Sequence, residues 1–172
     1  MPISIVTVSP NEAWILNVDS DENISVALFD RQGTIKQSIP LEFLCVGLAV
    51  EESNSLLVTC TDKTIVQRFI GCESTVIVPP SIFHPLGIAL FPDGDKIIAG
   101  FEKNNMAESE IGCVKIFSSA GNEISNFTTG CVIIPMMVCV LGCDMIALTY
   151  PDNHYVDIRS KNGKIIGKYN GR

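Results

Sequence analysis

The chain has 172 residues, of which 47% are hydrophobic and 18% are charged; this composition excludes intrinsic disorder and predicts a single folded domain, residues 1–172. Its formal net charge of −7, from 19 acidic and 12 basic residues, repels phosphate backbones unless the basic residues converge on one face. RNA is therefore a disfavoured partner.

Four apolar strands recur along the chain at intervals of about 40 to 50 residues. They end near Val8, Val50, Leu90 and Val140. Each leads through a polar turn into a second, a third and a fourth strand, and no helical periodicity interrupts the series. This pattern predicts an all-β fold, a β-propeller or partial propeller with four blade-like four-stranded antiparallel sheets. The expected blades are about 1–40, 41–80, 81–130 and 131–172.

The first two blades have short strands separated by polar turns. In the first blade we expect strands at Ile3–Val8, Trp14–Val18, Ile24–Phe29 and Thr34–Ile39. In the second blade we expect strands at Val46–Val50, Leu56–Cys60, Thr64–Phe69 and Thr75–Val78.

The third blade shows the clearest turn, Pro92-Asp93-Gly94-Asp95, in which Pro presets φ and Gly accepts a positive φ. Its expected strands are His84–Leu90, Lys96–Gly100, Cys113–Phe117 and Glu123–Phe127, and a polar excursion from Asn104 to Glu110 accounts for its extra length. The fourth blade is expected to contain Met136–Val140, Met145–Thr149, Tyr155–Ile158 and Lys164–Tyr169.

The first strands of the second and third blades are nearly continuous in apolar and small residues. Strands buried on both faces at the narrow hub of a propeller need this composition, because neighbouring sheets approach closely there. Gly47 and Gly87 are therefore predicted to be packing glycines.

The third and fourth blades carry short motifs that resemble the NHL repeat. Asn153-His154-Tyr155 followed by a Lys161-Asn162-Gly163-Lys164 turn is similar to the Asn-His-Arg stretch and Asp-Gly-Lys turn of that family, and Pro85-Leu86-Gly87-Ile88-Ala89 is similar to its Pro-x-Gly-Ile/Val-Ala start. Tyr155 replaces the usual Arg. The resemblance implies a β-propeller like the C-terminal module of tripartite-motif proteins, which recruits a protein or RNA.

The number of blades raises the question of closure. NHL propellers usually close with six blades, whereas four repeats in an open arc would expose an unpaired sheet edge and an apolar hub. The chain is expected to close as a four-bladed ring, to pair with a second copy, or to form part of a longer propeller. The mean hydropathy of +0.32 favours an incomplete or partner-completed arc, so self-association is among the expected interactions.

Acidic residues recur at the end of each predicted second strand: Asp19, Asp62, Glu102 and Asp152. If the blades superpose, these four carboxylates lie at one end of the propeller, where a ring of acids can hold a divalent cation. Propeller lactonases of the gluconolactonase type hold such an ion with Glu, Asn and Asp side chains. The other interpretation is that each acid accepts backbone N–H groups in its own turn, as Asp and Asn side chains often do.

Two further residues of the fourth blade, Asn153 and His154, complete the candidate ligand-binding set with these acids. The second histidine, His84, precedes Pro85 at the entrance of the third blade, and both histidines are expected to have structural roles. The chain lacks GxSxG, HExxH, phosphate-loop and Cys-His nucleophile patterns. We therefore predict no catalytic residue, no dedicated metal ligand and no cofactor for this chain.

The only dense group of basic residues is near the C-terminus. It contains Arg159, Lys161, Lys164, Lys168 and Arg172. These side chains are either solvent-facing charges of a hairpin or a contact for RNA phosphates.

The seven cysteines include no CxxC pair, so we expect reduced thiols that serve as small core residues. The N-terminal sequence lacks the pattern of a signal peptide, and no apolar run is long enough for a transmembrane helix. These features favour a cytoplasmic protein without membrane contact.

The sequence as a whole favours a non-enzymatic β-propeller scaffold that binds a protein partner, because rigid blades present loops at both ends of a channel without reactive groups. A metal-dependent hydrolase of the sugar-lactone type and an RNA-binding propeller module are the alternatives.

Overall fold

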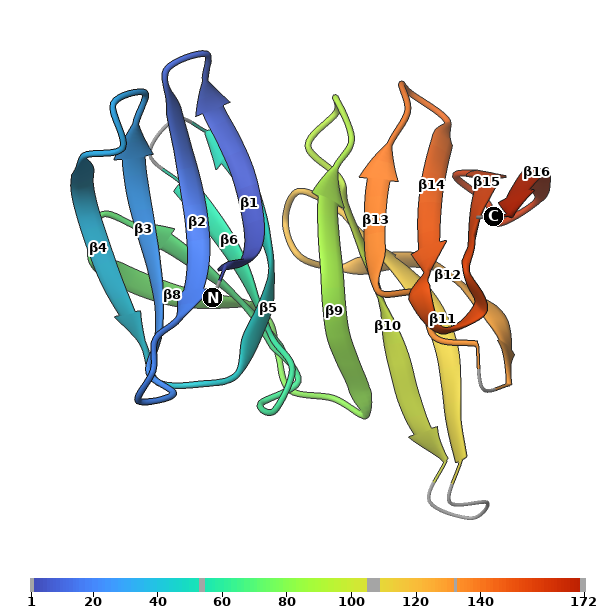
Figure 1. The fold of residues 1–172 in the computed structure, drawn as a ribbon. Helices are drawn as coiled ribbons and strands as arrows, with labels where there is room; N and C mark the ends of the chain where they lie inside the picture. Colours follow the sequence, from blue (N-terminus) through green and yellow to red (C-terminus); the bar gives the residue numbers. More distant parts are fainter. Residues whose placement is uncertain (1, 53–54, 105–108, 132, 171–172) are drawn as a thin grey trace.

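The computed structural model describes residues 2–52, 55–104, 109–131 and 133–170. Within them the chain forms four four-stranded antiparallel sheets, arranged as the blades of a β-propeller (Figure 1). The all-β propeller architecture predicted from the 40- to 50-residue spacing is therefore confirmed. No helix among the described residues has the length and apolar character needed to cross a membrane.

Blades 1 and 2 follow one another in the N-terminal half of the chain. Blade 1 consists of β1 (Pro2–Ser9), β2 (Glu12–Val18), β3 (Ile24–Asp30) and β4 (Ile35–Leu41). Blade 2 consists of β5 (Cys45–Glu52), β6 (Ser55–Cys60), β7 (Ile65–Ile70) and β8 (Glu73–Val78). In both sheets the spatial order of the strands is the order of the sequence, as expected for simple hairpin connections.

Blades 3 and 4 repeat this meander with one local change each. Blade 3 consists of β9 (Phe83–Leu90), β10 (Lys96–Asn104), β11 (Ser109–Phe117) and β12 (Glu123–Cys131). Blade 4 consists of β13 (Met137–Val140), β14 (Met145–Tyr150), β15 (Tyr155–Ser160) and β16 (Ile165–Asn170), with a 3-10 turn η1 (Pro151–Asn153) between β14 and β15.

The extra length of blade 3 is used differently from the polar excursion expected at 104–110. Strands β10 and β11 continue to pair as far as Asn104 and Ser109, so that they form one long hairpin that projects beyond the other blades (Figure 1). Asn104, Ser109 and Glu110 of the expected excursion are thus paired in the ladder, and its residues 105–108 lie outside the described ones.

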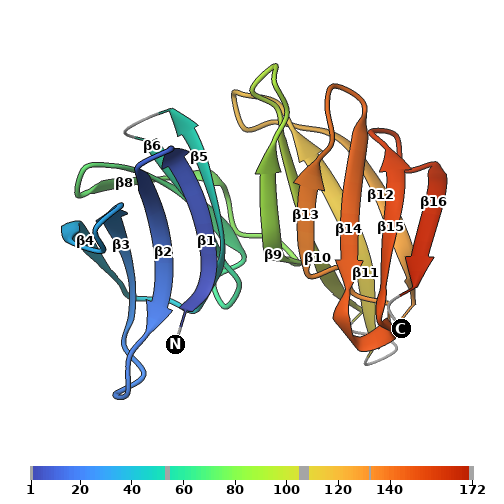
Figure 2. The same cartoon turned by 45° about the horizontal axis from the view of Figure 1, so that its top comes forward.

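The innermost strands form the hub. Strand β1 packs against β5, β5 against β9, and β9 against β13. Among the described residues β13 and β1 share no comparable packing, and Figure 2 shows blades 1 and 4 at the two ends of an open arc.

Each of the three seams between successive blades has its own apolar cluster. The seam of blades 1 and 2 contains Trp14, Leu16, Val26, Leu48 and Val58. The seam of blades 2 and 3 contains Leu57, Val66, Phe83, Ile88 and Ile98. The seam of blades 3 and 4 contains Ile97, Val114, Val138, Ile146 and Leu148.

The hub requires the two glycines singled out from the sequence. A Cβ atom on Gly47 would collide with the carbonyl oxygen of Leu86 in β9, and a Cβ atom on Gly87 would lie 2.6 Å from the carbonyl oxygen of Met136. Their prediction as packing glycines is confirmed, because the backbone of the next blade occupies the space of a side chain.

Fewer cysteines are buried than the sequence predicts. Cys45, Cys60 and Cys113 are buried free thiols in strands, as the sequence predicts for small core residues. Three others are exposed: Cys72, Cys139 and Cys143. The core role therefore holds for only half of the cysteines whose side chains are described.

Candidate functional site

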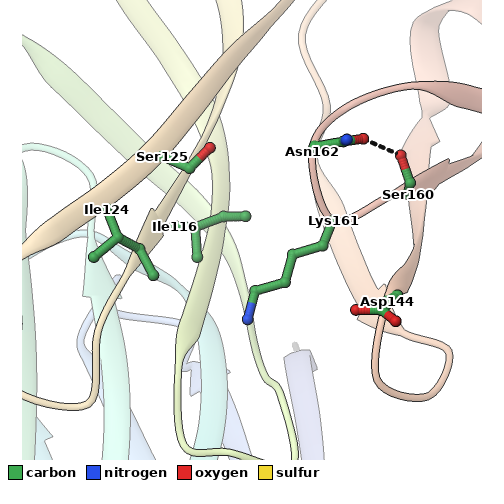
Figure 3. A pocket seen from close by; sticks show the side chains of 7 residues that line it. All are labelled: Ile116, Ile124, Ser125, Asp144, Ser160, Lys161 and Asn162. Atoms are coloured by element: carbon green, nitrogen blue, oxygen red, sulfur yellow. Dashed lines mark hydrogen bonds between the residues drawn. The ribbon is translucent and has the colours of Figure 1, made fainter.

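A groove between blades 3 and 4 is the candidate site (Figure 3). It has a volume of about 390 Å³. Blade 3 contributes Ile116, Ile124 and Ser125, and blade 4 contributes Asp144, Ser160, Lys161 and Asn162. Because its walls belong to different blades, the groove exists only when the seam between these blades is formed.

The floor and one wall of the groove are apolar. Ile116 on β11 belongs to the seam cluster and is buried, whereas Ile124 on β12 is 53% exposed. Strand β12 is the outermost strand of its sheet, so its far edge offers unpaired backbone groups beside Ile124. An exposed isoleucine next to such an edge suits an extended polypeptide with an apolar side chain.

The opposite wall is the β15–β16 turn, and local hydrogen bonds fix its shape. The amide of Lys164 donates to Oγ of Ser160 at 3.1 Å, and the amide of Gly163 donates to the Ser160 carbonyl at 2.9 Å. Gly163 takes φ +86°, a value that side chains with a Cβ disfavour. The amide of Lys161 donates to the carbonyl of Asp144 at 2.7 Å, which joins this turn to the β13–β14 turn.

Lys161, which lines the groove, is held by blade 3. Its Nζ lies 3.0 Å from Oδ2 of Asp95 and 3.2 Å from Oδ2 of Asp93, and 4.3 Å from the centre of the Phe91 ring. Burial by itself would lower the pKa of Lys161, but its hydrogen bonds to Asp95 and Asp93 outweigh burial and raise the pKa. Lys161 thus forms ion pairs that join blade 4 to blade 3 and is not a free positive charge.

The Asp93 carboxylate is stabilised in its ionised form. Its Oδ1 accepts the amide of Asp95 at 3.0 Å, and this hydrogen bond, with that from Lys161, lowers the pKa of Asp93. The other acid at the groove, Asp144, is exposed and leaves the groove with a negative charge at one end.

The acidic residues predicted as a candidate ring and the groove lie at opposite ends of the strands, on different faces of the propeller. Asp19 and Asp62 lie in β2–β3 and β6–β7 turns, Asp152 lies in η1 between β14 and β15, and Glu102 lies near the end of β10. Strand alternation places these connections at one end, whereas the β15–β16 turn of the groove is at the other.

Asp19 serves its own turn. Its Oδ1 accepts the amides of Asp21 at 2.8 Å and of Asn23 at 2.9 Å, and its Oδ2 accepts the side-chain amide of Asn23 at 3.0 Å. The hydrogen bonds from Asn23 lower the pKa of Asp19. This is the turn role that the sequence offered as the second interpretation for the acids.

The other members of the predicted set lie in three different blades. Glu102 binds Nζ of Lys115 at 2.9 Å. Asp62 is exposed in its turn, and Asp152, Asn153 and His154 are exposed at η1, where His154 takes φ 55° and its amide donates to the Pro151 carbonyl at 3.2 Å. Within residues 2–52, 55–104, 109–131 and 133–170, no three His, Cys, Asp or Glu side chains converge as metal ligands would. Ligand binding by the six predicted residues stays a prediction.

His84 has the structural role that the sequence suggests. Its Nδ1 lies 3.1 Å from the carbonyl oxygen of Thr61, and its ring stacks on Phe101 with a centroid distance of 4.7 Å. It therefore joins blade 3 to the β6–β7 turn of blade 2.

Most of the basic group near the C-terminus is already paired. Arg159 is buried and donates to Oδ2 of Asp157 at 2.7 Å, Lys161 binds the two aspartates of blade 3, and Nζ of Lys168 lies 3.5 Å from the centre of the Tyr155 ring. Lys164 is exposed, and Arg172 lies outside the described residues.

The sequence did not reveal the groove. Lys161 and Asp95 are 66 residues apart, and nothing in either segment indicates that they meet. The local signal for Ile124 is its position among polar residues in Glu123-Ile124-Ser125-Asn126 of an outer strand, a pattern that indicates an exposed apolar side chain.

Solved structures share the fold of this chain. A protein of unknown function from Bacteroides caccae matches with a TM-score of 0.68 and 13% identity over 95% of this chain and 59% of its own. A calcium-binding protein, regucalcin, from Agrobacterium tumefaciens matches with a TM-score of 0.65 and 12% identity over 98% of this chain and 58% of its own. A protein described as a candidate gluconolactonase matches with a TM-score of 0.63 and 15% identity over 96% of this chain and 60% of its own.

This chain thus spans about three fifths of the length of these propellers. At such identities the likeness extends to the fold alone. No family model and no curated protein matches the chain in sequence, so the NHL resemblance stays a prediction.

Proposed function

We propose that the chain is a non-enzymatic scaffold that binds a protein partner in the groove between blades 3 and 4. The single observation that supports this most is that a half-exposed Ile124 on an edge strand lines the same groove as the hydrogen-bonded turn at Ser160–Lys164. The partner would place an apolar side chain against Ile124 and a basic residue near Asp144.

The groove has the composition of a recognition surface rather than of a reaction centre. Its polar members Ser125, Ser160 and Asn162 can exchange hydrogen bonds with a peptide, and its lysine is neutralised by Asp93 and Asp95. Rigid walls reduce the entropy that a partner must lose on binding.

The experiment starts from peptides selected from a random phage-displayed library on the purified chain. We expect them to share an apolar residue flanked by Lys or Arg. Ile124→Glu should weaken their binding by about tenfold or more in fluorescence anisotropy, because it replaces an apolar contact with a charge. Val76→Glu, which changes a comparably exposed residue of blade 2, should leave binding unchanged. Peptides that bind both variants as they bind the unaltered chain would contradict the groove as the site.

The second candidate, a metal-dependent hydrolase of the sugar-lactone type, is favoured by the position of Asp19, Asp62, Glu102 and Asp152 near the same ends of the strands in four successive blades. The structural likeness of this chain to regucalcin and to the candidate gluconolactonase also supports this second candidate function. Calorimetric titration with Ca²⁺ and Mn²⁺ tests it, since a site built from these acids should lose its metal affinity in Asp152→Asn.

An RNA-binding module is supported less by the geometry, because Arg159, Lys161 and Lys168 are engaged with protein groups. Salt-dependent retention of RNA that is lost when Lys161, Lys164 and Lys168 are neutralised would favour it.

A further inference from the structure

The face of blade 1 that points away from blade 2 has the character of a buried seam. In blades 2, 3 and 4 the innermost strand places Leu48, Ile88 and Val138 against the preceding blade, with 6%, 6% and 7% of their surfaces exposed. The residue at the same register position of blade 1 is Ile5, which is 65% exposed. All four pair with an apolar residue of the second strand: Val58, Ile98, Leu148 and Ile15.

The face of blade 4 that points away from blade 3 shows the same relation. In blades 1, 2 and 3 the third strand places Val26, Val66 and Val114 toward the following blade, and each is fully buried. Blade 4 has Val156 at this position, and it is only half-buried. A valine that the other three blades bury completely is thus left with one side uncovered.

On each face, neither the cross-strand row that contains Ile5 or Val156 nor the next row on the same face carries a charged residue. In blade 1 the rows are Ile5, Ile15 and Ala27, and Thr7, Ala13 and Phe29. In blade 4 the rows are Met137, Thr149, Val156 and Tyr169, and Cys139, Ala147, Ile158 and Gly167. Uncharged rows of this kind favour burial against another sheet, since isolated soluble surfaces normally interrupt them with charges.

We propose that these two faces bind each other in different copies of the chain, so that blade 4 of one copy packs on blade 1 of the next. Every seam inside the chain joins the face of one blade that points toward the following blade to the face of the next blade that points toward the preceding one. Blade 4 has an uncovered face of the first kind, and blade 1 has an uncovered face of the second kind. A second copy therefore continues the series by the same kind of contact. Such a head-to-tail contact is heterologous, and it closes into a ring where the rotation between copies permits.

One residue makes this contact different from the internal seams. Met137 stands where blades 2 and 3 have Gly47 and Gly87, so β13 of one copy and β1 of the next lie farther apart at the hub than β5 and β9 do. A flexible methionine fills such a wider gap.

The first measurement is the mass of the full chain by light scattering between about 1 and 100 μM, a range in which a micromolar Kd is visible. We expect association beyond the monomer. A monomer over the whole range would overturn the proposal.

Two variants test the geometry. Ile5→Glu and Met137→Glu each place a charge in one face, and each should weaken self-association by roughly a hundredfold. Ile70→Glu alters a residue of blade 2 that is 60% exposed and should leave association unchanged. Circular dichroism of each variant confirms that it folds. If Ile5→Glu still associates, the copies pair through blade 4 alone and the head-to-tail contact is wrong.

A mixture of the two variants is the sharpest test. The Ile5→Glu copy keeps an intact blade 4 face, and the Met137→Glu copy keeps an intact blade 1 face, so one contact between them survives. The mixture should therefore form dimers and nothing larger, whereas each variant alone stays monomeric. Failure of two folded variants to form a dimer would contradict the proposal.

Discussion

The seam between blades 1 and 2 and the seam between blades 2 and 3 hold their blades together by different means. The first is an apolar cluster around Trp14, and no ion pair crosses it among the described residues. The second adds a buried charge network to its apolar residues. Nζ of Lys96, which is fully buried, lies 2.9 Å from Oε1 of Glu51, and Glu51 also binds Arg68 at 2.6 Å.

Further polar contacts cross the second seam. The hydroxyl groups of Thr59 and Thr61 donate to the carbonyl oxygens of Leu86 and Pro85 at 2.6 Å and 2.7 Å. Burial of apolar surface stabilises either seam, but only directional contacts require one relative position of the two blades. The first seam has such a contact from the side-chain amide of Gln37 to the carbonyl oxygen of Gly71 at 3.1 Å, whereas the second has the ion pair of Lys96 with Glu51 and both threonine hydrogen bonds. The comparison teaches that the second seam fixes the relative position of its two blades more strongly than the first.

The largest expected effect is on the apolar seam. Trp14→Ala should lower the free energy of unfolding by about 4 kcal/mol, because it removes a large buried side chain and leaves a cavity. Urea denaturation followed by circular dichroism measures the change. A loss below about 1 kcal/mol would mean that blade 1 contributes little to the cooperative unit.

The next effect tests the charged seam. Glu51→Ala should cost about 3 kcal/mol, since it leaves the ammonium group of Lys96 buried with the Ser119 carbonyl as its one remaining partner among the described residues. Adding Lys96→Met should restore part of the loss, because the double variant no longer contains an unpaired buried charge.

The matched control is Glu12→Ala, which breaks the more exposed pair with Lys36 and should cost at most about 1 kcal/mol. Equal losses for Glu51→Ala and Glu12→Ala in urea denaturation would show that burial of Lys96 does not matter.

The hub of the second seam gives a smaller effect. Gly47→Ala should cost about 2 kcal/mol, because the added methyl group must displace the backbone at Leu86. Gly167→Ala is the control, since its nearest contact is the flexible Tyr169 side chain at 3.5 Å. Thermal unfolding of the two variants should rank them in this order, and the reverse order would contradict close packing at the hub.

The sequence was sufficient for the blades but not for the contacts between them. Alternation and turn residues such as Pro92-Asp93-Gly94 act locally, so strand positions and the need for Gly47 and Gly87 could be read from the chain. The partner of Lys96 could not, because Glu51 is 45 residues away and strand Lys96-Ile97-Ile98 looks like any strand with an exposed lysine at its start.

The candidate site shows the same limit more strongly. The recurrence of Asp19, Asp62, Glu102 and Asp152 near the connections of second and third strands is visible in the sequence, but convergence of these acids depends on side-chain directions that spacing does not determine. The groove depends on how blade 4 packs on blade 3, to which the apolar seam cluster and the ion pairs of Lys161 with two aspartates of a distant turn both contribute.

The smallest expected effect concerns the seam between blades 3 and 4, where the ion pairs of Lys161 with Asp93 and Asp95 are partly exposed. The raised pKa of Lys161 means that its contribution is present below the ordinary lysine pKa and is lost as the pH rises through the raised value. The lowered pKa of Asp93 means that its contribution is present above the ordinary aspartate pKa and is lost as the pH falls through the lowered value. Lys161→Met should therefore lower the melting temperature slightly at pH 7 and should flatten its change below pH 4. A variant that loses stability equally at pH 3 and pH 7 would show that Lys161 acts through its packing on Phe91, as the apolar seam does, and not through its charge.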